Sequence, residues 1–438
     1  MAIEDPSPSF CALPWLHLFA DEGGLMYPCC RSVGTKKPNV NERGQPIRMH
    51  TVTSLEEAWN TGYMRTLRQD MLTGGRPKAC ERCYMYDDLG MRSHRQDAND
   101  EYRERIPALL AATDAEGRAP LDLRSVDLRL GNLCNLRCRM CSPQSSRALI
   151  GEFADAYGIA PTSRAFSELK ALDWFASEQF WTLFERHSGN IERLHFAGGE
   201  PLMIPQMFEF LERLVTLGRA PGISLSYNTN ATLLPDRVYD LWPHFARVRV
   251  TASIDGFGPV NSFIRFPSNW AVIDANLRRL EADRDRLNLR GGLAFNTTVQ
   301  VFNIFHLDAF LDYVVETFAF SEAPNLSLLT GPSHFSIQIM TAEMKDAAAA
   351  RLRAAMTRLS SRWPARWHGA ELESLLVSVD GIIEHMMKED AADQLPAFRK
   401  WCAIQDRHRQ QSTAEVLPEL APLLISGDVP SSEAEVRA

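Results

Sequence analysis

Residues 134–141 read Cys134-Asn135-Leu136-Arg137-Cys138-Arg139-Met140-Cys141, which spaces three cysteines as C-x3-C-x2-C. Three thiolates on one short loop can hold three irons of a four-iron cluster, and soft thiolate ligands favour iron–sulfur centres. The fourth iron then has no protein ligand and can bind a substrate, as the open position of a catalytic zinc site does. The loop therefore predicts a catalytic metal centre, and we expect the rest of the chain to supply, shield and use it.

The composition is that of an ordinary soluble globular protein. The chain has 438 residues, of which 45% are hydrophobic and 23% charged, and this predicts two or three domains with a sizeable core. The formal net charge is −8. This charge argues against nucleic acid as a partner, because binding to phosphates needs a basic face.

The N-terminus shows no targeting signal. The apolar run 10–20 is broken by Pro14 and His17, and Glu4 and Asp5 stand where a signal peptide needs positive charge. No stretch approaches the roughly 18–20 apolar residues of a membrane span. We therefore expect a cytoplasmic protein without membrane contact. In that reducing compartment its nine cysteines are better interpreted as metal ligands than as disulfides.

The first 105 residues form a cysteine-rich region. Cys80 and Cys83 make a C-x2-C pair that presents two sulfurs side by side. Gly24 predicts a tight hairpin, which would turn a second pair of sulfurs inward. The cysteines of this region are Cys11, Cys29, Cys30, Cys80 and Cys83.

Three further stretches outside the centre of the chain have a clear local pattern. A helix is predicted over 54–72, with Ser54 as its N-cap and Glu57 completing a capping box. Residues 106–121 contain Pro, Gly and Ala and predict a connector. Residues 336–438 are expected to be mostly helical, with strong helix formers over 347–359 and 371–388 and a polar tail after Ser426.

Residues 122–335 alternate short apolar runs with helical patterns. This alternation predicts an α/β fold with a parallel sheet or barrel, and six strands are fewer than the eight of a full barrel. We therefore expect a partial (β/α)6 TIM-like barrel. The predicted strands are 126–130, 191–196, 223–227, 248–254, 293–301 and 326–329, and the predicted helices between them are 171–187, 206–217, 235–245, 271–287 and 306–318.

Polar residues follow several of these strands, at the end where such folds carry their chemistry. The cysteine loop follows the first strand, and Ala197-Gly198-Gly199-Glu200-Pro201 follows the second. Two glycines let a backbone approach a ligand closely, and a carboxylate can accept from an ammonium group. Asn296, Thr298 and Gln300 alternate on the fifth strand and would face the lumen, where they could line a pocket or be satisfied core groups.

The cysteine loop and the Gly-Gly-Glu turn together resemble the signature of the radical S-adenosylmethionine (SAM) superfamily. The resemblance implies a [4Fe–4S] cluster on Cys134, Cys138 and Cys141 that binds SAM at its open iron. Met140 stands where family members usually have an aromatic residue, and it can still cover the cluster and contact adenine. The other residues that the resemblance assigns to SAM binding are Gly198, Gly199, Glu200, Asn230, Ser253, Asp255, Arg265 and Thr298.

The N-terminal cysteines resemble the twitch domain, a shortened form of the SPASM domain. That resemblance implies a second, auxiliary [4Fe–4S] cluster on Cys11, Cys29, Cys80 and Cys83, with Cys30 as a possible replacement for Cys29. In relatives this domain usually follows the barrel, whereas here it precedes it. Four thiolates would occupy every iron, so the auxiliary cluster should not bind SAM. The alternative is a structural zinc site, which four thiolates suit equally well.

The superfamily's chemistry implies reductive cleavage of SAM to a 5′-deoxyadenosyl radical, which takes a hydrogen atom from a substrate. We expect oxidative modification of, or bond formation in, a peptide or small natural product, with an electron donor such as flavodoxin or ferredoxin. A redox-neutral epimerase that uses Cys402 as hydrogen-atom donor is one alternative, although most isolated cysteines are buried apolar residues. A non-catalytic zinc-binding structural protein is the alternative from another class. Asp406 and Arg407 are either a surface pair or substrate contacts, and His195 is a core or lumen residue.

Overall fold

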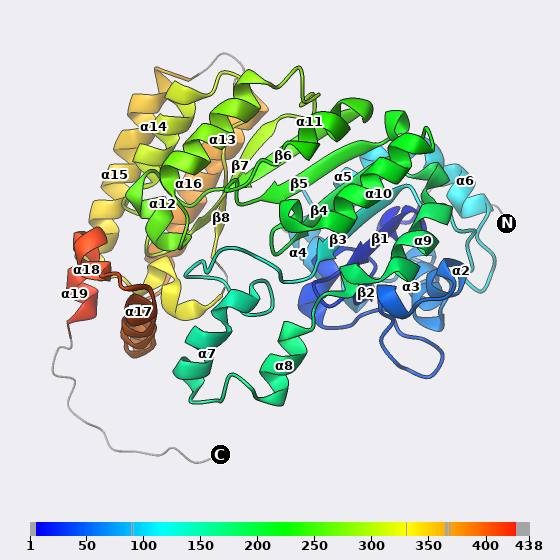
Figure 1. Cartoon of the computed structure of the whole chain (residues 1–438), viewed down its shortest axis with the longest axis horizontal. Helices are drawn as coiled ribbons and strands as arrows, with labels where there is room; N and C mark the ends of the chain where they lie inside the picture. Colours follow the sequence, from blue (N-terminus) through cyan, green and yellow to red (C-terminus); the bar gives the residue numbers. More distant parts are fainter. Residues whose placement is uncertain are drawn as a thin grey trace.

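A mostly parallel eight-stranded sheet forms the centre of the chain (Figure 1). The computed structural model describes residues 6–88, 90, 92–329, 331–363, 367 and 369–425. The strands lie in the order β2-β1-β3-β4-β5-β6-β7-β8, and the sheet does not close. The last six strands are parallel to one another and coincide with the six predicted runs: β3 (Ser125–Leu130), β4 (Arg193–Gly198), β5 (Ser224–Thr229), β6 (Arg247–Ser253), β7 (Leu293–Val299) and β8 (Asn325–Leu328). The predicted partial α/β barrel is confirmed.

The sequence did not reveal that the cysteine-rich region adds two strands to this sheet. β1 (His17–Ala20) pairs in parallel with β3, in a register that sets His17 beside Ser125. β2 (Met26–Tyr27) pairs antiparallel with β1, and Gly24 has a φ of 73° in the turn between them. The predicted hairpin at Gly24 is therefore confirmed, and its first strand is part of the sheet of the barrel.

Helices cover the apolar face of the sheet (Figure 1). Alternate strand residues such as Leu194, Leu225 and Val250 are at most 1% exposed and pack into one core with the helices. This core forms because the helices between the strands are amphipathic. The covering helices fall where they were predicted: α9 (Glu178–Arg186), α10 (Pro205–Thr216), α11 (Arg237–Leu241), α13 (Trp270–Ala282) and α14 (Leu307–Thr317). The helix α12 (Pro259–Ile264) between β6 and α13 was not predicted.

The opposite face of the sheet is polar and lines the lumen of the partial barrel. The register aligns Asp127, His195 and Ser226 across β3, β4 and β5, and the His195 ring nitrogen Nδ1 lies 2.8 Å from the Ser226 hydroxyl. Side chains of β6 and β7 on this face, including Ser253 and Thr298, are half-buried. The period-2 alternation thus separates an apolar face under the helices from a polar lumen.

Two predictions for the region before the barrel need correction. The helix predicted over 54–72 is two helices, because Thr61 caps a new helix with its hydroxyl and interrupts the first after Asn60. Ser54 caps the first helix as predicted by accepting from the Glu57 N–H, but its hydroxyl donates to Glu56 and the capping box with the Glu57 side chain does not form. The predicted connector 106–121 begins with a helix. The helices here are α1 (Leu13–Leu16), α2 (Leu55–Trp59), α3 (Gly62–Leu72), α4 (Glu81–Asp88), α5 (His94–Glu101) and α6 (Ile106–Ala111).

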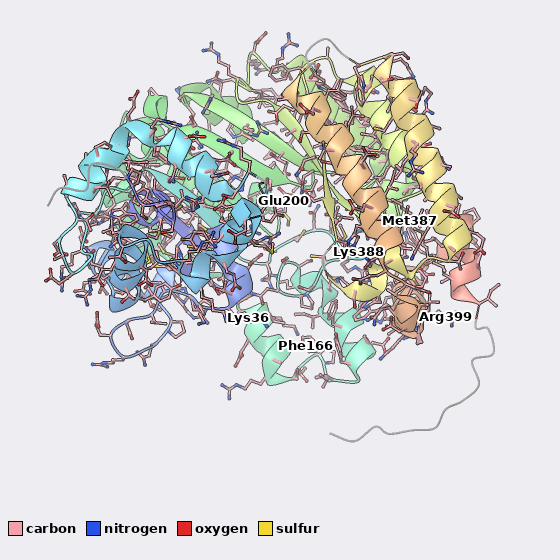
Figure 2. All side chains as sticks on the ribbon, turned by 180° about the vertical axis from the view of Figure 1, so that it is seen from behind. Lys36, Phe166, Glu200, Met387, Lys388 and Arg399 are labelled. Atoms are coloured by element: carbon pink, nitrogen blue, oxygen red, sulfur yellow. The ribbon has the colours of Figure 1, made fainter. Side chains whose placement is uncertain are left out.

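The remaining helices follow β3 or β8 in the chain. In the view of Figure 2, Glu200 lies toward the middle, between the region of Lys36 on one side and Met387 and Lys388 on the other. These helices are α7 (Ile150–Tyr157), α8 (Arg164–Lys170), α15 (Ala342–Ser360), α16 (Ala370–Lys388), α17 (Leu395–Arg409), α18 (Thr413–Val416) and α19 (Ala421–Leu424). The polar tail predicted after Ser426 lies outside the described residues. In the described part of the chain, no helix combines the length and the apolarity that crossing a membrane requires.

The two glycines at the end of β4 allow close packing within the protein. A Cβ at Gly199 would lie 2.2 Å from the Leu133 carbonyl oxygen, and one at Gly198, whose φ is 120°, would lie 2.6 Å from the Leu130 nitrogen. The backbone that approaches these glycines is the start of the cysteine loop. The glycines therefore fix where that loop leaves the sheet.

The Gly199→Ala substitution should lower the free energy of unfolding by about 1–3 kcal/mol, because the added methyl group must displace the backbone at Leu133. Urea unfolding monitored by circular dichroism measures the change. Gly222→Ala is the control, since a Cβ there meets nothing within 4 Å. Equal stability of the two variants would contradict the prediction.

Candidate functional site

Backbone hydrogen bonds hold the cysteine loop on two sides. On the β4 side, the Gly199 N–H donates to the Gly131 carbonyl at 3.0 Å and the Glu200 N–H donates to the Leu133 carbonyl at 2.8 Å. On the other side, the segment 264–266 after α12 accepts two bonds. The Arg137 N–H donates to the Phe266 carbonyl at 2.6 Å, and the Arg139 N–H donates to the Ile264 carbonyl at 2.8 Å. These two residues flank Cys138.

The three loop thiols lie close enough to influence one another. Cys138 is 8% exposed, and Cys134 and Cys141 are half-buried. Burial, followed by the nearby thiols, raises the pKa of Cys134 and of Cys141 to about 12. Buried thiols that oppose one another's ionisation gain most from a bound cationic metal centre, because thiolates are its ligands. The donor set therefore fits an iron–sulfur cluster.

Glu200 is buried at the end of β4 and joins three elements. Its Oε1 atom accepts from the Thr229 hydroxyl at 2.8 Å and the Leu202 N–H at 3.1 Å, and its Oε2 atom accepts from the Asn230 N–H at 2.8 Å. Burial raises the pKa of Glu200 to about 7, against the effect of these hydrogen bonds. The Asn230 amide nitrogen reaches the Cys134 sulfur at 3.9 Å. The end of β5 is thus tied to both the glycine turn and the cysteine loop.

Asp255 and Arg265 form a buried ion pair beside Cys138. The Arg265 Nε atom lies 2.7 Å from Asp255 Oδ2, and Arg265 Nη1 lies 3.9 Å from the Cys138 sulfur. Burial raises the pKa of Asp255, and the guanidinium opposes that shift. The other carboxylate oxygen, Oδ1, accepts from the Thr298 N–H at 2.8 Å. Arg265 and Thr298 therefore both contact Asp255, and Arg265 also lies beside Cys138.

The remaining predicted SAM-binding residues stand at the mouth of the lumen. Ser253 and Thr298 are half-buried at the ends of β6 and β7, and Met140 is half-buried and packs against the main core. Gln300 is fully buried, and its amide donates to the Thr298 carbonyl at 3.3 Å. Gln300 is therefore tied to the backbone of β7, while Thr298 keeps part of its surface toward the lumen.

The structure also gathers the N-terminal cysteines. Burial and the neighbouring thiols of Cys11, Cys29 and Cys83 raise the pKa of Cys80. The first electrostatic neighbour of Cys30 is the Cys29 thiol, followed by Asp127 of the barrel. Within the described ranges, no group of three or more His, Cys, Asp or Glu side chains could hold a metal ion. That finding concerns one ion, whereas a four-iron cluster carries its thiolates on separate irons.

Sequence reasoning missed Arg139 and its contacts with α17. Arg139 is 1% exposed, and its Nη2 atom donates to Asp406 Oδ1 at 2.6 Å. Asp406 is thus the partner of a buried arginine, and Arg407 forms a surface ion pair with Asp155. Cys402 is 2% exposed, and burial raises its pKa to about 12. The sequence feature that could have indicated a structural role for Arg139 is its charge within the cysteine loop.

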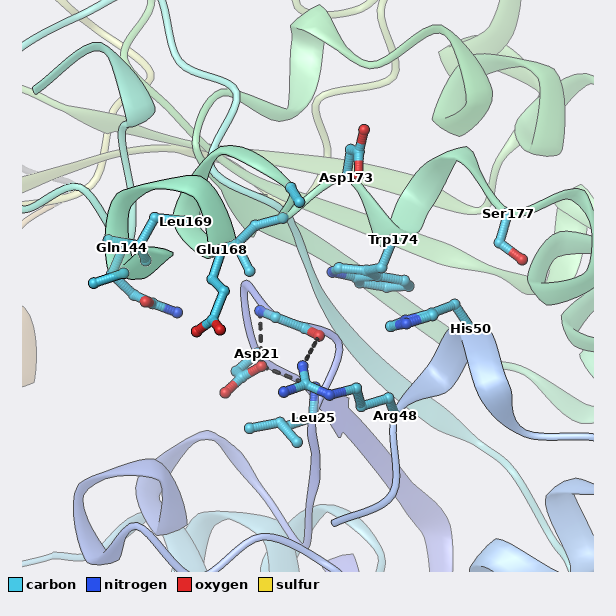
Figure 3. Close-up of a pocket in the computed structure, with 14 residues that line it drawn as sticks. Asp21, Leu25, Arg48, His50, Gln144, Glu168, Leu169, Asp173, Trp174 and Ser177 are labelled. Atoms are coloured by element: carbon cyan, nitrogen blue, oxygen red, sulfur yellow. Dashed lines mark hydrogen bonds between the residues drawn. The ribbon is translucent and has the colours of Figure 1, made fainter. Parts of the chain in front are cut away.

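A pocket of about 710 Å³ lies beside the cysteine loop (Figure 3). Its walls come from the β1–β2 turn, from Arg48 and His50, from Gln144 just after the loop, and from residues 165–177. The turn is fixed, because Arg48 donates to the Gly23 carbonyl at 2.7 Å and Asp21 accepts from the Gly23 and Leu25 N–H groups at 2.9 Å. On the other side of the same turn, Glu22 accepts from Ser145 at 3.3 Å.

The fold is a partial α/β barrel with a cysteine loop after its first parallel strand, and comparison with known proteins shows what it resembles. Residues 128–283 match the family model described as the Radical SAM superfamily. Among curated proteins, GTP 3′,8-cyclase from Gloeobacter violaceus is 32% identical over 166 residues, which cover 37% of this chain and 45% of that protein. Residues 128–283 thus form a radical SAM domain, and members of that superfamily are enzymes that use a [4Fe–4S] cluster and SAM.

Solved structures of low sequence identity were also compared. The structure of native anSMEcpe with bound AdoMet and the Cp18Cys peptide is 15% identical with a TM-score of 0.34, and the match covers 55% of this chain and 62% of that one. Streptococcus suis SuiB bound to S-adenosylmethionine is 9% identical with a TM-score of 0.35, over 69% of this chain and 64% of that one. The chain spans less than two thirds of each of these relatives.

The histidine at the start of β1 predicts a pH-dependent stability. Burial, followed by the charges of His94 and His195, lowers the pKa of His17 to about 3 from an ordinary 6.5. The native state therefore binds fewer protons than the unfolded chain, so this contribution is present above pH 6.5 and is lost as the pH falls toward 3. Between pH 7 and pH 5 the loss should be about 2 kcal/mol.

His17→Gln should therefore make the free energy of unfolding fall less steeply between pH 7 and pH 5 than in the unmodified protein. Urea unfolding at several pH values measures the slope. His244→Gln, which removes an exposed histidine, is the control. An unchanged slope in His17→Gln would show that His17 is not buried in its neutral form.

Proposed function

We propose that this protein reductively cleaves SAM at a cluster held by Cys134, Cys138 and Cys141. The cluster and SAM, when bound, supply a 5′-deoxyadenosyl radical that removes a hydrogen atom from a substrate in the lumen. The observation that carries the proposal is the convergence of the cysteine loop with Glu200 and Arg265. These groups arrive from β3, β4 and the segment after β6, and all lie at the carboxyl ends of the strands.

The residues around the loop have distinct proposed roles toward SAM. Arg265 is the cation placed to bind the SAM carboxylate, for which Asp255 holds the guanidinium in position until the cofactor arrives. Glu200 has three of its hydrogen-bonding positions occupied and one available to an ammonium group. Gly198, Gly199, Asn230, Ser253, Thr298 and Met140 line the same mouth and shield the reaction from water.

The four cysteines Cys11, Cys29, Cys80 and Cys83 are proposed to hold an auxiliary [4Fe–4S] cluster. Their mutual influence on pKa supports this set, and Cys29 is supported as the fourth ligand because its thiol is among those that raise the pKa of Cys11 and of Cys80. A second cluster would relay electrons or position the substrate.

The proposed domain division has four parts. Residues 1–105 form the auxiliary domain, 106–121 the linker, 122–335 the radical SAM core and 336–438 the helical region.

The substrate is proposed to be a peptide that undergoes oxidation or bond formation. The polar lumen and the pocket of Figure 3 meet at one turn, since Glu22 lies 3.8 Å from Arg129 of the lumen face and Asp21 lines the pocket. A substrate that fills both must be longer than a single small metabolite. Two of the compared structures contain peptides by their titles, anSMEcpe with Cp18Cys and SuiB with the precursor peptide SuiA. The electron donor is proposed to be a flavodoxin or ferredoxin.

Cluster content provides the direct test of this function. Anaerobically purified protein should contain about eight iron atoms, and reduction in the presence of SAM should yield 5′-deoxyadenosine. Replacing Cys134, Cys138 and Cys141 together by alanine should abolish 5′-deoxyadenosine and leave about four iron atoms in the N-terminal region. Iron and sulfide analysis with product chromatography measures both quantities. Bound zinc and no cleavage of SAM would instead support the zinc-binding structural protein.

Deuterium incorporation separates oxidation from the alternative, epimerisation with Cys402 as donor. In deuterium oxide, an oxidised product should lose two electrons and carry no solvent deuterium at the reacting carbon, because no thiol returns a hydrogen atom to it. Mass spectrometry of the product measures both. One deuterium at the reacting carbon without a change in oxidation state would favour the epimerase. In that case Cys402→Ala should abolish epimerisation. Cys30→Ala tests a second thiol, whose electrostatic neighbours include Asp127 and Arg129 of the lumen face.

A further inference from the structure

The cysteine loop contains a buried cation whose partners come from the opposite end of the sequence. Arg139 directly follows Cys138, and its side chain has no exposed surface. Its Nη2 atom donates to Asp406 at 2.6 Å and to Gln411 at 3.2 Å. Its own carbonyl accepts from the Gln405 amide at 2.9 Å. A guanidinium in the protein interior is tolerated only with such counter-charge and hydrogen bonds, so α17 and the residues after it stabilise the loop in this position.

Asp406 is itself fixed, so it can fix Arg139. Its Oδ2 atom accepts from the Thr413 N–H at 2.7 Å and the Thr413 hydroxyl at 2.8 Å. Arg139 also lies over the Phe263 ring, with its guanidinium carbon 3.6 Å from the ring centroid. Phe263 directly precedes the segment 264–266 that holds the loop backbone. The guanidinium is therefore enclosed by α17 on one side and by that segment on the other.

A second buried pair links α17 to the other arginine of the loop. Arg409 donates to Glu152 of α7 through two nitrogens, at 3.0 and 2.7 Å, and neither side chain is exposed. Glu152 also lies 3.4 Å from Arg137, the residue that precedes Cys138. Both neighbours of Cys138 in the sequence are thus connected through charged groups to the same helix.

We propose that α17 is a positioning element of the cluster site. By holding Arg139 and Arg137 it fixes the backbone at Cys138 between them, and so keeps the three thiols at the spacing that the metal centre needs. Asp406, Gln405 and Arg409 act through the loop and are positioning residues, because none of them is a ligand in the proposed set. The identity of the metal in this inference rests on the proposed function. The contacts by which α17 holds Arg139 and Arg137 do not depend on it.

The same two helices provide a matched control. Arg407, adjacent to Asp406 on α17, pairs with Asp155 of α7, but 64% of the Arg407 side chain and 40% of the Asp155 side chain are exposed. Exposed pairs contribute little to stability, and this one does not contact the loop. Arg407→Ala therefore removes a salt bridge between α17 and α7 and leaves the contacts of Arg139 in place.

The experiment is metal release from the holoprotein of Asp406→Asn. In this variant, an iron chelator should remove the SAM-binding cluster about tenfold faster than in the unmodified protein, since lost outer contacts typically weaken metal sites by 10–100-fold. The SAM-binding cluster is identified by the EPR signal that changes on addition of SAM. Arg407→Ala should release it at the unmodified rate. Asp406→Glu, which keeps the charge, should recover part of the retention. Equal release rates in Asp406→Asn and Arg407→Ala would overturn the inference.

A metal-free readout distinguishes this inference from the proposed function. In the apoprotein of Asp406→Asn, the amides of Arg137 and Arg139 should exchange with deuterium faster than in Arg407→Ala, because their bonds to 264–266 lose support. If the unmodified loop holds zinc, the proposed function fails, while zinc release and amide exchange still test whether α17 positions the loop. Gln405→Ala, which retains the ion pair, is the milder variant if Asp406→Asn does not fold, and it too should release metal faster than Arg407→Ala.

Discussion

The backbone of residues 131–141 is held between two neighbouring segments, and the positions of all three loop thiols depend on that constraint. On one side, glycines at 198 and 199 let the loop approach β4 so closely that no side chain fits between them. On the other, the N–H groups flanking Cys138 pair with the carbonyls of Phe266 and Ile264. Backbone hydrogen bonds on both sides thereby restrain a loop without regular structure, which is what a preorganised metal site requires.

This arrangement buries charged groups, and the protein balances each of them. Arg265 is paired with Asp255, Arg139 with Asp406 and Arg409 with Glu152. Breaking one such pair leaves a buried charge without compensation and typically costs about 3–5 kcal/mol. In the described part of the chain, the exceptions are Glu200, which has hydrogen bonds but no paired cation, and the thiols, each of which opposes the ionisation of its neighbours. Among the described residues, the groups of the site without counter-charge are therefore Glu200 and the thiols, and a cationic cluster would supply that charge to the thiols.

The N-terminal region is structurally continuous with the barrel. β1 extends the parallel sheet next to β3, and the chain then continues through the hairpin at Gly24 to Cys29 and Cys30. Cys30 has Asp127 and Arg129 of the lumen face as electrostatic neighbours, so the N-terminal cysteines lie close to the edge of the lumen. A substrate in the lumen would then be flanked by both sets of cysteines. That placement gives the proposed auxiliary cluster a physical route to affect the chemistry.

The sequence by itself determined the alternation of β3 to β8 with helices and the two groups of cysteines, because period-2 and period-3.6 patterns and ligand spacings are local properties. It also predicted that Glu200 would follow the second strand, and the family resemblance assigned Arg265 to the same site. Only the tertiary structure decided that β1 joins the sheet, that Gly199 packs against Leu133, and that Arg139 meets Asp406. Each of these depends on contacts between segments far apart in the chain, for which a single sequence carries no periodic or compositional signal. The four-residue strand β1 and the isolated charge of Arg139 acquire their roles only when the fold brings their partners to them.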